Sequence, residues 1–216
     1  MSETILLDED SYEADHVKHS IGGFGGHIFR RAIHLSMAII PWLYYWHGEF
    51  IAGIIGINPI DFVILVLFAI LIFELIRLKI GFTIVGQREY EAHQLSALFW
   101  GVISVGVALI LSPLVGVNGA ALGYPLILGL AIGDPVMGEA RRADKDSKIV
   151  FISGLIVVYL AWLLSWNLIG TPLLFALIMP PIQVASEWPR LRWIDDNGTM
   201  VLFPLLVVIL LSFMVL

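Results

Sequence analysis

The sequence predicts an all-α membrane protein, built as one polytopic bundle of about seven transmembrane helices. Hydrophobic residues make up 59% of the 216 residues and charged residues only 14%, and the mean hydropathy is +0.91. A transmembrane helix needs about 20 mainly apolar residues, and seven apolar runs approach that length. Because lipid offers no partners to peptide groups, each spanning segment is expected to be a helix.

The seven predicted spans are separated by polar or glycine-containing segments. They run at about 28–46, 59–78, 92–111, 119–139, 149–166, 172–187 and 199–216. An odd number of spans places the two termini on opposite sides of the membrane. A shorter apolar stretch at 50–57 is too brief to cross and is expected to form an interfacial or re-entrant turn.

All twelve Lys and Arg residues fall on one side of the membrane in this topology. They are Lys18, Arg30, Arg31, Arg77, Lys79, Arg88, Arg141, Arg142, Lys145, Lys148, Arg190 and Arg192. The positive-inside tendency therefore places the N-terminus and these residues on the cytoplasmic side and the C-terminus outside.

The chain is expected to hold one folded unit behind a short tail. Residues 1–26 form an acidic, glycine-rich segment that is expected to be mobile, and residues 27–216 form a single transmembrane catalytic domain. The negative tail disfavours nucleic acid as a partner. No cysteine is present, which excludes disulfides and thiol chemistry. We expect no cleaved signal peptide, and the compact chain favours the plasma membrane of a bacterium or archaeon.

The first two groups of ionisable residues lie near the cytoplasmic ends of spans, where a charge in hydrocarbon is costly. In the first span, His27, Arg31 and His34 share one helix face because they are three or four residues apart. Anchoring at the membrane interface explains a single arginine. His34 lies a turn inside the apolar run, which favours a functional role for it. In the second span, Glu74 and Arg77 also share a face, as a structural ion pair or as part of a polar cavity.

The third group begins near the end of the fourth predicted span. Proline disfavours α-helical geometry at the residue before it, so Asp134 is expected at a helix break made by Pro135. Gly133 and Gly138 allow close approach of a ligand or another helix. Acidic Glu139 follows, and then a basic run. That run consists of Arg141, Arg142, Lys145 and Lys148. Carboxylates beside arginines and lysines suit a magnesium-bound polyphosphate.

The fourth group precedes the last span. Asp195 and Asp196 are adjacent and repel one another unless a cation is near. Asp196 or Asn197 also suits the N-cap of the final helix. Arg190, Arg192 and Thr199 lie in the same segment.

Five short motifs resemble, in order and spacing, those of the dolichol kinase and phytol kinase family, which is related to the phosphatidate cytidylyltransferases. They are Arg30-Arg31-Ala32-Ile33-His34, Glu74-Leu75-Ile76-Arg77, Arg88-Glu89-Tyr90-Glu91, Gly133-Asp134-Pro135-Val136-Met137-Gly138 and Asp195-Asp196-Asn197-Gly198-Thr199. The resemblance implies transfer of a phosphate from a nucleoside triphosphate, typically CTP, to a long isoprenoid alcohol. The basic loop after Asp134 departs from the family pattern, which leaves the donor base open.

Phosphoryl transfer depends mainly on positioning and charge stabilisation, and this chemistry assigns roles to the four groups. The predicted catalytic residues are Asp134, His34, Arg31, Glu74 and Arg77. The predicted nucleotide-binding residues are Arg30, Arg141, Arg142, Lys145, Lys148, Asn197 and Thr199. The predicted Mg²⁺ ligands are Asp134, Glu139, Asp195 and Asp196. The expected partners are CTP or another triphosphate, an isoprenoid alcohol and the bilayer, with a homodimer left open.

Two other functions are compatible with parts of this pattern. A cytidylyltransferase that acts on a lipid phosphate would use the same ions and nucleotide but would release pyrophosphate. A non-catalytic transporter or scaffold is the second alternative. A transporter should carry polar residues through the centres of its spans, whereas these centres are nearly all apolar.

Overall fold

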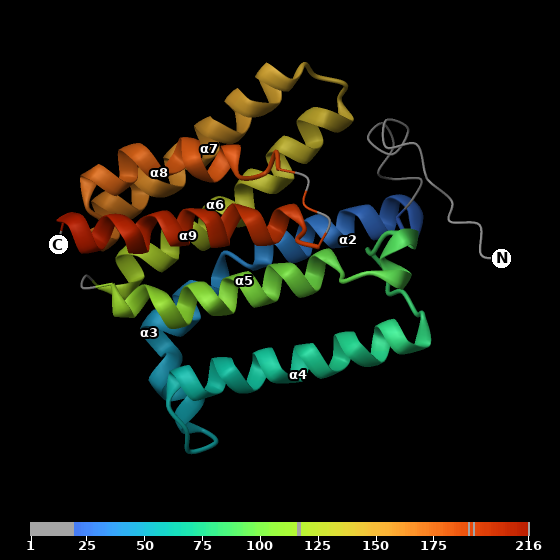
Figure 1. Ribbon diagram of the computed structural model, residues 1–216, viewed down its shortest axis with the longest axis horizontal. Coiled ribbons are helices and arrows are strands. Elements are labelled where there is room, and N and C mark those ends of the chain that lie inside the picture. The colour runs from blue at the N-terminus through green and yellow to red at the C-terminus, as the bar shows by residue number, and fades with distance from the viewer. Residues whose placement is uncertain (1–19, 116–117, 190, 192, 216) are drawn as a thin grey trace.

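The chain forms a bundle of α-helices and has no β-strand in the part that the structure describes (Figure 1). A computed structural model describes residues 20–115, 118–189, 191 and 193–215, with the backbone alone for 213–215. The α-helices are α2 (Gly23–Ser36), α3 (Ile39–Gly53), α4 (Pro59–Ile80), α5 (Ala97–Leu111), α6 (Gly119–Arg142), α7 (Ser147–Ile169), α8 (Leu173–Ala185) and α9 (Asp196–Val215). Short 3₁₀ helices, η1 (Glu89–His93) and η2 (Ser112–Leu114), flank α5.

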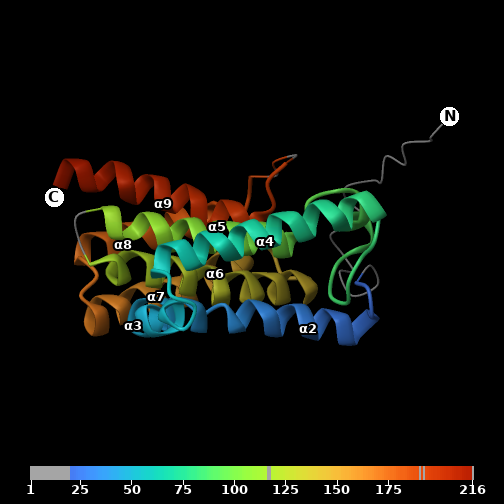
Figure 2. The same ribbon diagram turned by 90° about the horizontal axis from the view of Figure 1, so that it is seen from below.

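Helix α6 is the centre of the bundle, and α4 is its most exposed member. In the most apolar part of each helix, 78% of α6 is buried but only 11% of α4. Helix α6 contacts α2, α3, α5, α7, α8 and α9, and Figure 2 shows it between the layer of α2 and the layer of α4, α5 and α9. Any chemistry on α6 is therefore shielded on most sides by protein.

The predicted all-α class is confirmed, and the length and composition of the helices agree with a membrane protein. Within the described residues, four helices are long and apolar enough to cross a membrane. They are Pro59–Ile80, Ala97–Leu114, Gly119–Arg142 and Ser147–Ile169. Helices α8 and α9 are apolar but shorter over their described parts. The count of seven spans stays a prediction.

The first predicted span is not one continuous helix. It divides into α2 and α3 at Met37 and Ala38, and α3 extends to Gly53, through part of the stretch expected to be a re-entrant turn. Pro41 explains the division, because it has no N–H to donate to the Met37 carbonyl and its ring crowds that carbonyl.

Two further expectations about helix limits are wrong. Asp134 does not lie at a break, since α6 continues through Pro135 to Arg142. One missing hydrogen bond is tolerated there because the helix is packed on several sides. The third span also begins later than expected, at Ala97, where Ser96 Oγ accepts a hydrogen bond from Phe99 N at 3.1 Å. Such an N-cap satisfies a donor that the first helical turn leaves free.

The expected mobile tail lies mostly outside the described residues. Its last part is ordered, because α2 begins at Gly23. The backbone at Ile21 also bonds to the loop before η1, from Ile21 N to Gln87 O at 2.8 Å and from Gly86 N to Ile21 O at 3.0 Å. The start of α2 is thus joined to the middle of the α4–α5 connection.

Candidate active site

One face of α2 is joined to α6 by contacts between bases and acids. His27 Nε2 lies 2.8 Å from Glu139 Oε1, and Arg31 Nε donates to the same oxygen at 3.2 Å. Arg31 Nη1 donates to Asp134 Oδ2 at 3.1 Å, and His34 Nδ1 lies 3.0 Å from that oxygen. The predicted stripe of His27, Arg31 and His34 therefore faces the predicted acidic residues of α6.

Gly138 makes room for this arrangement. A Cβ atom at position 138 would overlap the guanidinium of Arg31. Gly133, by contrast, faces α7, where a Cβ would come within 2.9 Å of Val158 Cγ2. The sequence predicted that these glycines allow close approach of a ligand or of another helix. Both of them allow close approach of another helix.

Three carboxylates from different elements converge beside Arg31. Asp134 of α6, Glu187 after α8 and Asp196 at the start of α9 each offer one oxygen, and these oxygens lie within 4.8 Å of one another. We call this set the acid triad. Asp134 and Glu187 are buried. Carboxylate oxygens from three segments can surround a hard divalent cation such as Mg²⁺, which prefers oxygen ligands.

Glu187 is the triad member with the most unusual environment. Its Oε1 accepts a hydrogen bond from Arg141 Nη1, while its buried Oε2 has no hydrogen-bond partner among the described residues. Burial raises the pKa of this carboxyl to about 8, although Arg141 opposes the rise. The Arg141 guanidinium also lies over the Trp188 ring, 5.3 Å from its centroid. A buried carboxyl oxygen without a hydrogen-bond partner is available as a ligand for a cation.

Asp195 and Asp196, at the start of α9, are a second group of closely spaced acids. Burial, and then the charge of Asp196, raise the pKa of Asp195 well above its ordinary value. Asp195 Oδ1 accepts hydrogen bonds from the backbone and side-chain nitrogens of Asn197, at 3.1 and 2.7 Å. Thr199 Oγ1 donates to the Asp196 carbonyl at 3.2 Å. Asn197 and Thr199, predicted to bind nucleotide, are buried and help to shape this turn.

Glu74 and Arg77 form a buried pair with a structural role. Arg77 donates twice to Glu74, at 2.8 Å each. Its remaining hydrogen bonds go to the carbonyls of Phe82, Glu91 and Gln94. These five bonds use every N–H that a guanidinium has, so this geometry leaves none for a phosphate. The pair instead anchors the α4–α5 connection, and its predicted catalytic role stays a prediction.

Arg30 and Arg88 bring that connection close to the acids. Arg30 Nη1 donates to Glu91 Oε1 at 2.9 Å, and Glu91 Oε2 accepts from Ala97 N at 3.2 Å. Burial lowers the pKa of Arg88, but the influence of Tyr90 and of the carboxylates before α9 is larger and raises it overall. The loop of the third resembling motif therefore lies at the same end of the bundle as the acid triad.

The remaining predicted residues lie nearer the surface. Arg142 Nε lies 2.9 Å from Glu139 Oε2, and Lys145 and Lys148 are exposed around the turn between α6 and α7. Glu139 contacts His27, Arg31 and Arg142 and does not belong to the acid triad. Arg190 and Arg192 lie outside the described residues.

Sequence reasoning placed Asp134 and Asp196 together but did not single out Glu187 as a ligand. Glu187 could have been found from its position, because it is an acid at the end of an apolar span, at the same end of the bundle as the other acids. The sequence also did not indicate that His27 pairs with Glu139 or that Glu91 pairs with Arg30. Long-range partners of this kind require knowledge of which helices are neighbours.

No protein-family model, curated protein or solved structure matches this chain. What the site does is therefore argued from its residues.

Proposed function

We propose that this protein is a membrane-embedded kinase that transfers the terminal phosphate of a nucleoside triphosphate, CTP by resemblance, to an isoprenoid alcohol. The observation that carries the proposal is the acid triad, whose three oxygens lie within 4.8 Å of one another, beside Arg31 and Arg141. Acids to hold Mg²⁺ and arginines to hold phosphate are the two components that phosphoryl transfer requires. The five motifs that resemble the dolichol and phytol kinase family support the same reading.

The carboxylates of the site fit a magnesium ion, and the arginines beside them fit phosphate. Asp134, Glu187 and Asp196 would hold the ion, and a bound Mg²⁺ supplies neutralisation of the negative phosphate oxygens. Arg31 and Arg141 already contact two of these acids, at Asp134 and Glu187. When a triphosphate binds, the same guanidinium groups are placed to donate to its oxygens.

The transfer step uses an alcohol oxygen as the nucleophile. That oxygen forms a bond to the γ-phosphorus, the bond from the γ-phosphorus to the β–γ bridging oxygen breaks, and the nucleoside diphosphate leaves with that oxygen. His34 accepts the alcohol proton in this proposal, since Asp134 contacts its Nδ1 and leaves Nε2 as an acceptor. An oriented imidazole next to a carboxylate is a common general base.

The orientation in the membrane is part of the same proposal. We assign seven spans, a cytoplasmic N-terminus and an external C-terminus, with the site on the cytoplasmic face of a bacterial or archaeal plasma membrane. The support is the one-sided distribution of the twelve basic residues. A cytosolic triphosphate would then meet a membrane-dissolved alcohol at the acid triad.

The test is product analysis with purified protein in detergent. The protein is incubated with Mg²⁺, each of the four common ribonucleoside triphosphates, and geranylgeraniol, phytol or dolichol. The proposal expects a lipid monophosphate and a nucleoside diphosphate in equal amounts. A parallel reaction supplies a lipid phosphate in place of the alcohol, and formation there of pyrophosphate and a nucleotide-linked lipid would instead identify a cytidylyltransferase. Absence of turnover with every combination would overturn the proposed kinase.

A further inference from the structure

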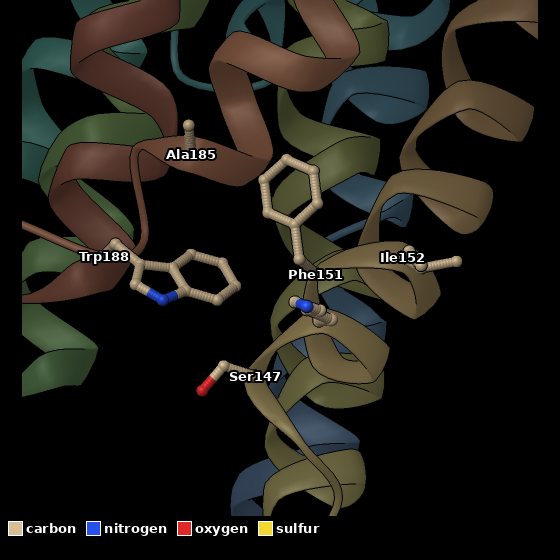
Figure 3. Close-up of a pocket in the computed structure, with 6 residues that line it drawn as sticks. Ser147, Phe151, Ile152, Ala185 and Trp188 are labelled. Carbon is tan, nitrogen blue, oxygen red and sulfur yellow. The ribbon is translucent and has the colours of Figure 1, made fainter.

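An open groove lies between the start of α7 and the end of α8, next to the candidate active site. Its volume is about 480 Å³, within the usual range of small-molecule sites. It is lined by Ser147, Lys148, Phe151, Ile152, Ala185 and Trp188. Figure 3 shows the rings of Trp188 and Phe151 next to each other, with Ala185 on one side and Ser147 on the other.

The groove continues onto the exposed apolar surface of α7. Ile152, Ile156, Leu160 and Leu164 are each about half exposed, and their four-residue spacing places them on one stripe of the helix. Helix α7 is one of the four that can cross a membrane. A molecule dissolved in the bilayer can therefore reach the groove sideways along this stripe.

The wall of the groove adjoins the acid triad through Arg141. Trp188 packs edge to face on Phe151, with ring centroids 5.5 Å apart, and its ring also lies beneath the Arg141 guanidinium. Arg141 pairs with Glu187, which belongs to the triad. The aromatic wall of the groove is thus one residue away from a candidate magnesium ligand.

The polar residues of the groove suit the end of an amphiphile. Ser147 supplies a hydroxyl and Lys148 an ammonium group at the start of α7, whereas Phe151, Ile152 and Trp188 supply apolar surface. Tryptophan at the end of a span is typical of the boundary between hydrocarbon and water. One apolar chain with one polar end matches this lining.

We infer that this groove binds the isoprenoid chain of the acceptor alcohol next to its hydroxyl, and so presents the hydroxyl to the acid triad. The inference rests on the proposed function for the identity of the alcohol. Lys148 then serves the lipid monophosphate product as well as the nucleotide, because it lines the groove next to Ser147.

Photolabelling tests the groove independently of turnover. A geranylgeraniol analogue with a diazirine near the hydroxyl is bound to the full chain in detergent and illuminated, and the labelled peptides are identified by mass spectrometry. Labels within residues 147–152 and 185–188, displaced by excess geranylgeraniol but not by excess phospholipid, support the inference. Labels spread over the exposed faces of other helices, or displaced equally by phospholipid, overturn it.

A bulky substitution tests the groove by kinetics. Ala185→Phe adds a ring at an exposed position of the lining and is expected to raise KM for geranylgeraniol about tenfold, as expected for a crowded apolar pocket, with KM for the nucleotide unchanged. Leu65→Phe is the matched control, since it adds the same ring at an exposed apolar position of α4 that does not line the groove or its stripe. Equal KM values for the alcohol in the two variants would overturn the inference.

The two experiments separate this inference from the proposed function. If the wild-type protein phosphorylates no alcohol, the kinase proposal fails, while the photolabels still decide whether the groove binds the alcohol. If the wild-type protein is active and Ala185→Phe behaves like Leu65→Phe, the kinase proposal stands and the groove is wrong.

Discussion

At the scale of single residues, Gly138 controls the position of Arg31. A Cβ at position 138 would overlap the far end of the Arg31 side chain, which can move aside more easily than backbone can. Gly138→Ala is therefore expected to leave the bundle folded but to pull Arg31 away from Asp134. A misplaced catalytic group costs on the order of 100-fold in rate. The measurement is kcat for lipid phosphorylation, together with the unfolding temperature in detergent.

Gly25→Ala is the control for this substitution. Gly25 lies in α2, the helix that carries Arg31, and has open space where a Cβ would stand. We expect its activity to match that of the wild-type protein. If Gly138→Ala were as active as Gly25→Ala, Arg31 would not act on the transferring phosphate.

Arg77 illustrates a different use of a buried charge. Arg77→Met leaves the Glu74 carboxylate buried without its partner and frees three backbone carbonyls. The expected loss in the free energy of unfolding is about 3–5 kcal/mol. Thermal unfolding in detergent measures it, with Lys79→Met, at an exposed position of the same helical turn, as the control. Equal unfolding temperatures would show that the pair does not anchor the α4–α5 connection.

At the scale of elements, the junction between α8 and α9 makes the protein sensitive to pH. The Glu187 carboxyl has a pKa of about 8 in the folded chain against 4.5 ordinarily, chiefly because it is buried. Between these values the folded chain binds more protons than the unfolded chain, so stability falls as pH rises from about 4.5 to 8. We expect the unfolding temperature of the metal-free protein to fall across this range.

Glu187→Gln removes the titrating group and is expected to flatten the dependence, whereas Glu49→Gln, at an exposed position of α3, is expected to leave it unchanged. Millimolar Mg²⁺ should raise the unfolding temperature of the wild-type protein most at high pH, because a cation replaces the protons. A metal-free protein that gains stability as pH rises would contradict this account of Glu187.

The helices themselves were largely predictable, because long apolar runs bounded by polar residues have few alternatives in a membrane. Their limits were less so. Pro41 divides an apolar run that composition predicts as one span. Pro135 also lies inside an apolar run, but α6 continues through it. The difference lies in packing, since α6 is the central helix, and packing cannot be read from one segment.

The sequence predicted most residues of the site but not which of them contact one another. The three-and-four spacing of His27, Arg31 and His34 correctly indicated a shared face, but only the fold shows that this face meets Asp134 and Glu139. Glu187 joins Asp134 because the end of α8 returns to the end of α6. Contacts between residues tens of positions apart depend on helix order in space.

At the scale of the whole molecule, the one-sided basic residues predict the topology. The chain has no cysteine, so single cysteines can be introduced and labelled with a membrane-impermeant maleimide. Ala143→Cys, after α6, is expected to react only from the cytoplasmic side, and Leu114→Cys, before α6, only from outside. Both positions are exposed. Labelling of both from the same side would contradict the assignment of the spans.

The central claim is that the acid triad binds the metal that phosphoryl transfer needs. The most direct measurement is the Mg²⁺-dependent formation of geranylgeranyl phosphate and CDP from CTP by the wild-type protein and by Asp134→Asn, Glu187→Gln and Asp196→Asn. The account predicts turnover by the wild-type protein and a loss of about 100-fold or more in each variant, with the exposed Glu49→Gln unaffected. Equal turnover by the triad variants and the wild-type protein would contradict it.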